Sequence, residues 1–62
     1  MKLIDLLDLT TCDLVKIVQG GKELFIGKVE DTPYKHMRRE IIAFGFVLDE
    51  LEELEIVLQI AV

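Results

Sequence analysis

Hydrophobic and polar positions alternate with a period of two in the first half of the chain. The alternation covers residues 14–19 and 23–30, and it predicts two β-strands. Gly20-Gly21 stands between them, and two adjacent glycines supply the positive φ angles of a tight hairpin turn. The pattern therefore predicts an antiparallel hairpin.

Centring the turn on the two glycines sets the predicted register of this hairpin. Ile17 then pairs with Leu24, and Val15 pairs with Ile26, so that the four side chains form one apolar face. Gly27 interrupts the second strand and predicts a bend or bulge there.

The second half of the chain is apolar on both faces of its predicted strands. Residues 40–48 and 53–61 read as a second hairpin, in which Leu54 to Ile60 alternate with more polar positions. A helix over Asp49–Gln59 is the competing interpretation, because its leucines also fit helical spacing. The longer period-two alternation and the density of Ile and Val favour the strand.

Two short helices complete the pattern. Residues 2–9 place Leu3, Leu6 and Leu7 on one side, which predicts a short helix lying on the core. Asp31-Thr32-Pro33 predicts the start of a second helix that ends near Glu40, because proline suits the first helical turn.

The order helix, two strands, short helix, two strands predicts a single α+β domain over residues 1–62. Two consecutive hairpins with a strong bend favour a small, half-open SH3-like β-barrel, or a four-stranded sheet with helices on one face. The predicted inner core consists of Val15, Ile17, Leu24, Ile26, Ile42, Phe44, Phe46, Leu54, Ile56, Leu58 and Ile60.

The apolar content exceeds what so short a chain can bury. Hydrophobic residues make up 52% of the 62 residues, and a domain of this size has little interior. One cysteine and one histidine provide neither an internal disulfide nor a Cys/His zinc site, so oligomerisation is the remaining support. We predict a homo-oligomer joined through the second apolar face, with Ile41, Ala43, Val47, Val57 and Val62 as candidates.

The charge distribution limits the classes of partner. The net charge is −5, and residues 41–62 hold five carboxylates and no cation. This balance argues against duplex nucleic acid and against an anionic membrane surface. We find neither a secretory signal nor a run of transmembrane length, so a cytoplasmic location is the expectation.

One basic cluster stands out in this acidic chain. On the predicted helix, Lys35, Arg38 and Arg39 fall on one face, where like charges repel. A bound anion would offset that repulsion, and arginine suits phosphate, while Tyr34 and His36 add a ring and a further donor. The five residues are the candidate site for a phosphorylated or nucleotide-like ligand; the alternative is a solvated or salt-bridged face.

The remaining polar residues predict no chemistry. His36 has no Ser, Cys or Asp in register with it, and Cys12 is expected to be a buried, inert thiol. The acidic run of residues 49–55 lacks the spacing and the glycine of a calcium loop, and is expected to be a solvated hairpin loop. We therefore expect no catalytic residues, no metal and no cofactor.

The layout resembles small, uncharacterised phage- or prophage-type proteins of Gram-positive bacteria. Lys2–Leu9, Asp13–Glu30 around the two glycines, and Asp31-Thr32-Pro33-Tyr34 carry this resemblance, which is one of build. It implies a non-enzymatic inhibitor of bacterial defence that sequesters a nucleotide signal or blocks a host protein. The sequence thus predicts a homo-oligomeric binding protein for a phosphorylated ligand. The alternative is a protein–protein inhibitor or adaptor that uses exposed apolar surface and the acidic loop.

Overall fold

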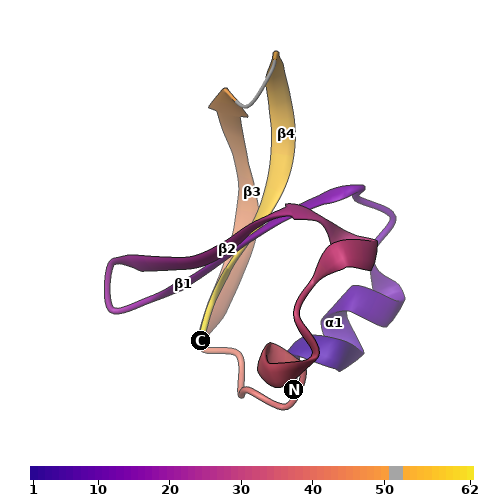
Figure 1. The fold of residues 1–62 in the computed structure, drawn as a ribbon, viewed down its shortest axis with the longest axis vertical. Helices are drawn as coiled ribbons and strands as arrows, with labels where there is room; N and C mark the ends of the chain where they lie inside the picture. The colour runs from indigo at the N-terminus through magenta and orange to yellow at the C-terminus, as the bar shows by residue number, and fades with distance from the viewer. Residues whose placement is uncertain (51–52) are drawn as a thin grey trace.

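The protein folds as one open four-stranded mixed sheet with a short helix on one face (Figure 1). The computed structural model describes residues 1–50 and 53–62. The elements are α1 (Leu3–Leu9), β1 (Leu14–Gln19), β2 (Lys22–Lys28), β3 (Ala43–Glu50) and β4 (Leu54–Ala61). The strand order is β2-β1-β4-β3. The α+β class is confirmed.

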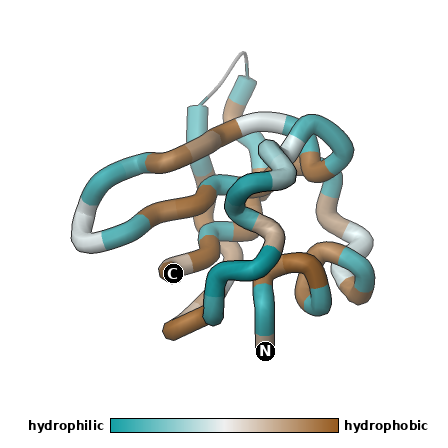
Figure 2. The backbone as a smooth tube through the Cα atoms, turned by 60° about the horizontal axis from the view of Figure 1, so that its bottom comes forward, coloured by the Kyte–Doolittle hydropathy of each residue, from teal (hydrophilic) through white to brown (hydrophobic). Residues whose placement is uncertain are grey.

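The first hairpin forms where the alternation predicts it. Gly20 and Gly21 adopt φ angles of 57° and 81°, which is the left-handed backbone that the tight turn requires. The turn is polar, and in Figure 2 it is the teal and white loop that projects from the rest of the chain. The hairpin prediction is therefore confirmed.

The predicted register of this hairpin is wrong, because β2 contains a bulge. Ile17 pairs with Phe25 and Val18 pairs with Glu23, so Leu24 has no partner in β1. An extra residue in one strand turns every following side chain to the other face. Phe25 therefore takes the place opposite Ile17 that was predicted for Leu24, and both side chains pack against the core.

The shift continues to the end of the hairpin. Val15 pairs with Gly27, and Ile26 pairs with Lys16 instead of Val15. A Cβ atom on Gly27 would lie 3.0 Å from Cζ of Phe25. The glycine therefore makes room for the aromatic ring. The bulge itself lies at Leu24, three residues before its predicted position at Gly27.

The second hairpin is also confirmed, and it joins the first through a parallel pair. β3 and β4 pair antiparallel along their length, and β4 pairs parallel with β1. Residues 49–50 and 54–59 are strand, so the helical interpretation of this region is wrong for them; Leu51 and Glu52 lie outside the described residues. β2 and β3 are the two edges of the sheet, and the half-open barrel is not confirmed.

Helix α1 lies on the sheet as predicted, with Leu3, Leu6 and Leu7 buried. Its first turn is held by carbonyl groups from a distant segment. The backbone N–H of Leu3 donates to the carbonyl of Arg39 at 2.9 Å, and that of Ile4 donates to the carbonyl of Met37 at 3.0 Å. These bonds satisfy donors that a helix leaves without an internal partner.

The predicted helix over residues 31–40 is not confirmed. Two single 3₁₀ turns, Val29–Asp31 and Tyr34–His36, take its place. The physical reason is that the end of the segment pairs in extended form with the N-terminus: Glu40 forms an antiparallel bridge with Lys2, and the N–H of Ile41 donates to the carbonyl of Met1 at 3.0 Å. Before that bridge, the N–H groups of His36 and Met37 donate to carbonyls three residues back, at 3.1 Å each, which closes 3₁₀ turns and no α-helical turn.

The core lies between α1 and the part of the sheet formed by β1 and β4. Its buried members are Leu3, Leu6, Leu7, Val15, Ile17, Leu58, Ile60 and Val62. Four predicted core residues are among them, and Leu24 and Ile26 are half-buried. The prediction is wrong for five others, which are exposed: Ile42, Phe44, Phe46, Leu54 and Ile56.

Candidate interaction surface

Large apolar side chains gather on one face of the β3–β4 hairpin. The residues of this apolar hairpin face are Phe44, Phe46 and Leu48 from β3 and Leu54 and Ile56 from β4, and each is 57–67% exposed. Cross-strand partners lie on the same side of a sheet, and Leu48 is opposite Ile56. The five side chains therefore form one surface.

This surface is the uncovered part of the face that carries the core. Phe46 is opposite Leu58 and Phe44 is opposite Ile60, and both partners are buried in the core. A seven-residue helix is about 10 Å long, whereas the eight residues of β4 extend over roughly 26 Å. Figure 1 shows the hairpin running beyond the helix to a distant tip. The shortness of the predicted helix was the signal in the sequence that this face stays open.

The exposed area is large for a chain of this size. With Ile42, which precedes β3 and is 78% exposed, six large apolar side chains lie in or next to the surface. Their combined area is on the order of 600 Å², the upper end of what monomeric soluble proteins expose in one patch. An area of this size is typical of an interaction site.

The residues predicted for the oligomer interface occupy different environments. Val57 and Val62 are buried within the chain, Ile41 and Val47 are half-buried, and Ala43 is exposed. The register pairs Val47 with Val57 and Ala43 with Ala61, on the side of the sheet opposite the apolar hairpin face. The sheet thus exposes its largest apolar side chains on the side that the sequence predicted to be inside.

An ion pair crosses this opposite side of the sheet. Nζ of Lys16 lies 3.3 Å from Oδ2 of Asp49 and 3.9 Å from Oε1 of Glu23. Lys16 is beside Gln59 and Asp49 is beside Glu55, so the pair passes over β4 at Val57. Val57 is completely buried there. The chain itself therefore covers this side of the sheet at Val57.

The predicted ligand-binding cluster is only partly accessible. Tyr34, Lys35 and Arg38 are exposed, Arg39 is half-buried, and His36 is buried. Because the segment contains a single 3₁₀ turn and no α-helix, the helical face that was predicted to gather the cations is not formed. Nothing here tests the binding of a phosphorylated ligand, which stays a prediction.

His36 and Arg39 make contacts within the chain. Nε of Arg39 donates to Nδ1 of His36 at 3.1 Å, and a terminal nitrogen of its guanidinium donates to Oε1 of Gln19 at 3.4 Å. Burial lowers the pKa of His36, and the positive charges of Arg39 and Lys35 lower it further. The pair therefore fastens the 3₁₀ turn to the end of β1.

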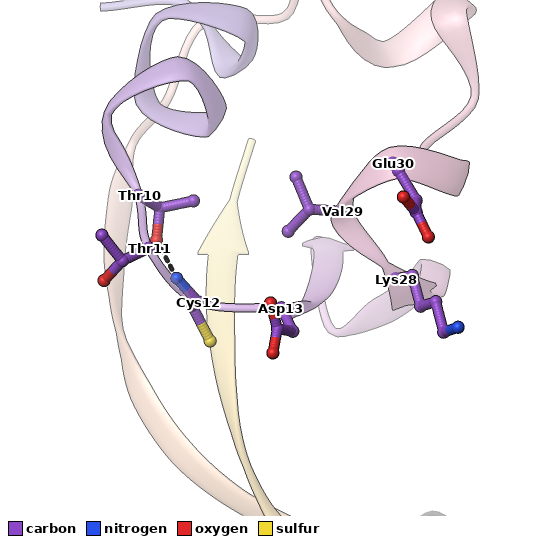
Figure 3. Close-up of a pocket in the computed structure, with 7 residues that line it drawn as sticks. All are labelled: Thr10, Thr11, Cys12, Asp13, Lys28, Val29 and Glu30. Atoms are coloured by element: carbon purple, nitrogen blue, oxygen red, sulfur yellow. Dashed lines mark hydrogen bonds between the residues drawn. The ribbon is translucent and has the colours of Figure 1, made fainter.

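A surface hollow lies between the α1–β1 connection and the end of β2 (Figure 3). Thr10, Cys12 and Asp13 line one side, and Lys28 and Glu30 line the other. Sγ of Cys12 donates to the carbonyl of Leu14 at 3.2 Å. Figure 3 shows the Lys28 and Glu30 side chains pointing away from the opposite wall, so polar groups do not converge on the hollow.

The described part of the chain contains neither a group of metal ligands nor a helix that could span a membrane. Within residues 1–50 and 53–62, no three His, Cys, Asp or Glu side chains are grouped to hold a metal ion. The same residues include no helix with the length and apolar character needed to cross a membrane.

Comparisons with known proteins assign the chain to no family. No family model, no curated protein and no solved structure matches it significantly. The resemblance to small phage-type proteins therefore stays a prediction, and the surface of the molecule is the guide to its function.

Proposed function

We propose that this chain is a homo-oligomeric binding protein that self-associates through the apolar hairpin face. The observation that carries the proposal is the exposure of Phe44, Phe46, Leu48, Leu54 and Ile56 on one side of β3 and β4. Interfaces of stable complexes bury about 800 Å² on each partner. The apolar hairpin face with its polar surroundings supplies an area of that order.

The accessible cations give the ligand-binding part of the proposal weaker support. Lys35 and Arg38 are exposed and are suited to an anion. The Arg39 guanidinium, in contrast, is bonded to His36 and Gln19. An anionic ligand would therefore meet two cations and the ring of Tyr34, which is a smaller site than the sequence predicts.

A protein–protein inhibitor or adaptor is the second candidate function. It is favoured by the position of the carboxylates, because Glu50, Glu53 and Glu55 are exposed at the end of the same hairpin. An apolar surface bordered by charge is typical of a site that recognises another protein. This candidate function also uses the apolar hairpin face, but the face would be covered by a different protein and not by a second copy.

Analytical ultracentrifugation of the purified chain over a range of concentrations tests the proposal. The wild-type chain is expected to sediment as an oligomer, and the double variant Phe46→Ser/Leu48→Ser is expected to weaken association at least about thirtyfold. Leu9→Ser is the matched control, because Leu9 is 72% exposed on α1, outside the apolar hairpin face. Circular dichroism checks that all three chains are folded.

Two results would contradict self-association through the apolar hairpin face. A wild-type chain that stays monomeric at every concentration favours the inhibitor or adaptor. If the wild-type chain is an oligomer and the double variant and the control weaken association equally, the contact lies on another surface.

A further inference from the structure

The charges of the molecule are separated along the direction of the β3–β4 hairpin. At its tip, Glu50, Glu53 and Glu55 are exposed, and we call these three the acidic tip. Asp49 is beside them, but its carboxylate already pairs with Lys16. Residues 41–62 contain no lysine or arginine, so the hairpin cannot neutralise its own tip.

The opposite end of the molecule carries exposed cations. Lys35 and Arg38, here called the basic segment, are both exposed. They form no ion pair within residues 1–50 and 53–62. Figure 1 places the chain around Tyr34–His36 beside the N-terminus, at the end of the molecule away from the hairpin tip. The apolar hairpin face thus lies between two exposed cations at one end and the three exposed carboxylates of the acidic tip at the other.

This polarity selects one arrangement of two identical chains. A two-fold axis that kept the hairpins parallel would bring two acidic tips together, in a chain whose net charge is already −5. A two-fold axis perpendicular to the hairpins makes them antiparallel, and each acidic tip then approaches the basic segment of the other copy. Complementary charges at the border of an interface determine orientation and exclude like-charged alternatives.

We propose that the occupant of the apolar hairpin face is a second copy of this chain, docked antiparallel, with the acidic tip of each copy against the basic segment of the other. The inference rests on the proposed self-association and adds its orientation. It also gives Lys35 and Arg38 a role, because the two cations of each copy would attract the acidic tip of the other copy. Apolar contact supplies the affinity, and the two charged junctions fix the orientation.

Charge reversal at one end, followed by reversal at both ends, tests the orientation. Lys35→Glu/Arg38→Glu makes both junctions repulsive, and we expect its dimer dissociation constant to rise about tenfold. Combining it with Glu50→Lys/Glu53→Lys restores attraction with inverted polarity, so the quadruple variant is expected to dimerise like the wild type. Lys22→Glu/Lys28→Glu is the matched control, because both lysines are exposed in β2 and the net charge changes equally.

Ultracentrifugation of the four chains separates the outcomes. Weakening beyond the control, with recovery in the quadruple variant, supports the antiparallel dimer. If the basic-segment variant matches the control, or the quadruple variant does not recover, the orientation is wrong while self-association stands. A monomeric wild-type chain would instead remove the proposed function and the inference together. Circular dichroism of each variant confirms that the comparison is between folded chains.

Discussion

At the scale of single residues, the bond between His36 and Arg39 shows how this small chain uses a charged segment for structure. Nδ1 of His36 accepts the hydrogen bond from Nε of Arg39 at 3.1 Å, so this nitrogen carries no proton. The imidazole is only 5% exposed, and burial is the first cause of its lowered pKa. Protonation would place a cation beside Arg39 and remove the acceptor.

The stability of the fold is therefore expected to fall as the pH falls through the His36 range. The unfolded chain protonates its histidine near the ordinary value of 6.5, whereas the folded chain resists protonation because its pKa is lower. Stability is thus full above about pH 6.5 and decreases below it. Urea unfolding at about pH 7.5 and about pH 5.5 measures the decrease. His36→Gln keeps an acceptor oxygen without the titration, and an equal decrease in that variant would contradict the prediction.

Gly27 makes a second residue-scale prediction, because its missing side chain gives space to an aromatic ring. A Cβ atom there would meet Cζ of Phe25 at 3.0 Å, and the ring can yield only by moving. We expect Gly27→Ala to cost about 1 kcal/mol of unfolding free energy, and to cost less in a Phe25→Leu background. Gly45→Ala is the control, because nothing lies within 4 Å of that position. If Gly27→Ala costs the same unfolding free energy in both backgrounds, contact with the Phe25 ring is not the cause of the loss.

At the scale of elements, helix α1 depends on packing more than on its own sequence. Seven residues form too few internal hydrogen bonds to be stable in water. The carbonyls of Met37 and Arg39 accept from its first turn, and three leucines attach it to the sheet. A change at one of these leucines therefore acts on the helix and on the core together.

Leu6 and Leu9 are matched positions for measuring this dependence. Leu6 is buried, whereas Leu9 is 72% exposed three residues later in the same helix. We expect Leu6→Ala to reduce the unfolding free energy by about 2–4 kcal/mol, and Leu9→Ala to change it by less than about 0.5 kcal/mol. Urea unfolding measures both values. Similar losses at the two positions would contradict this dependence on burial, because alanine favours a helix at least as well as leucine does.

The strands and both hairpins could be predicted from the sequence, whereas the register of the first hairpin and the parallel β1–β4 pair could not. The glycine turn and the period-two alternation located all four strands. The bulge at Leu24 left no mark in the pattern, because Leu24, Phe25 and Ile26 are apolar at consecutive positions. The residues after Pro33 were predicted as a helix because local signals do not reveal that Glu40 pairs with Lys2.

At the scale of the whole molecule, the sequence predicted a surplus of apolar surface and placed it on the wrong side. Both faces of residues 41–48 are apolar, so periodicity does not decide which one α1 covers. The face with the larger side chains was expected inside. In the folded chain α1 leaves these larger side chains exposed, while Lys16 and Asp49 form an ion pair over Val57 on the opposite side. The composition therefore indicated that an apolar surface stays exposed, but the sequence pattern did not show which face of the sheet carries it.

Self-association through this surface makes the stability of the fold depend on concentration. Only folded chains present the apolar hairpin face as one surface, so association stabilises the native state by mass action. A hundredfold increase in protein concentration then adds up to about 2.7 kcal/mol per dimer. We expect the urea midpoint of the wild-type chain to rise with concentration and that of Phe46→Ser to stay constant. Leu9→Ser, whose change lies on α1, is expected to keep the wild-type rise. A constant wild-type midpoint would contradict self-association, and a Phe46→Ser midpoint that still rises would place the contact away from the β3–β4 hairpin.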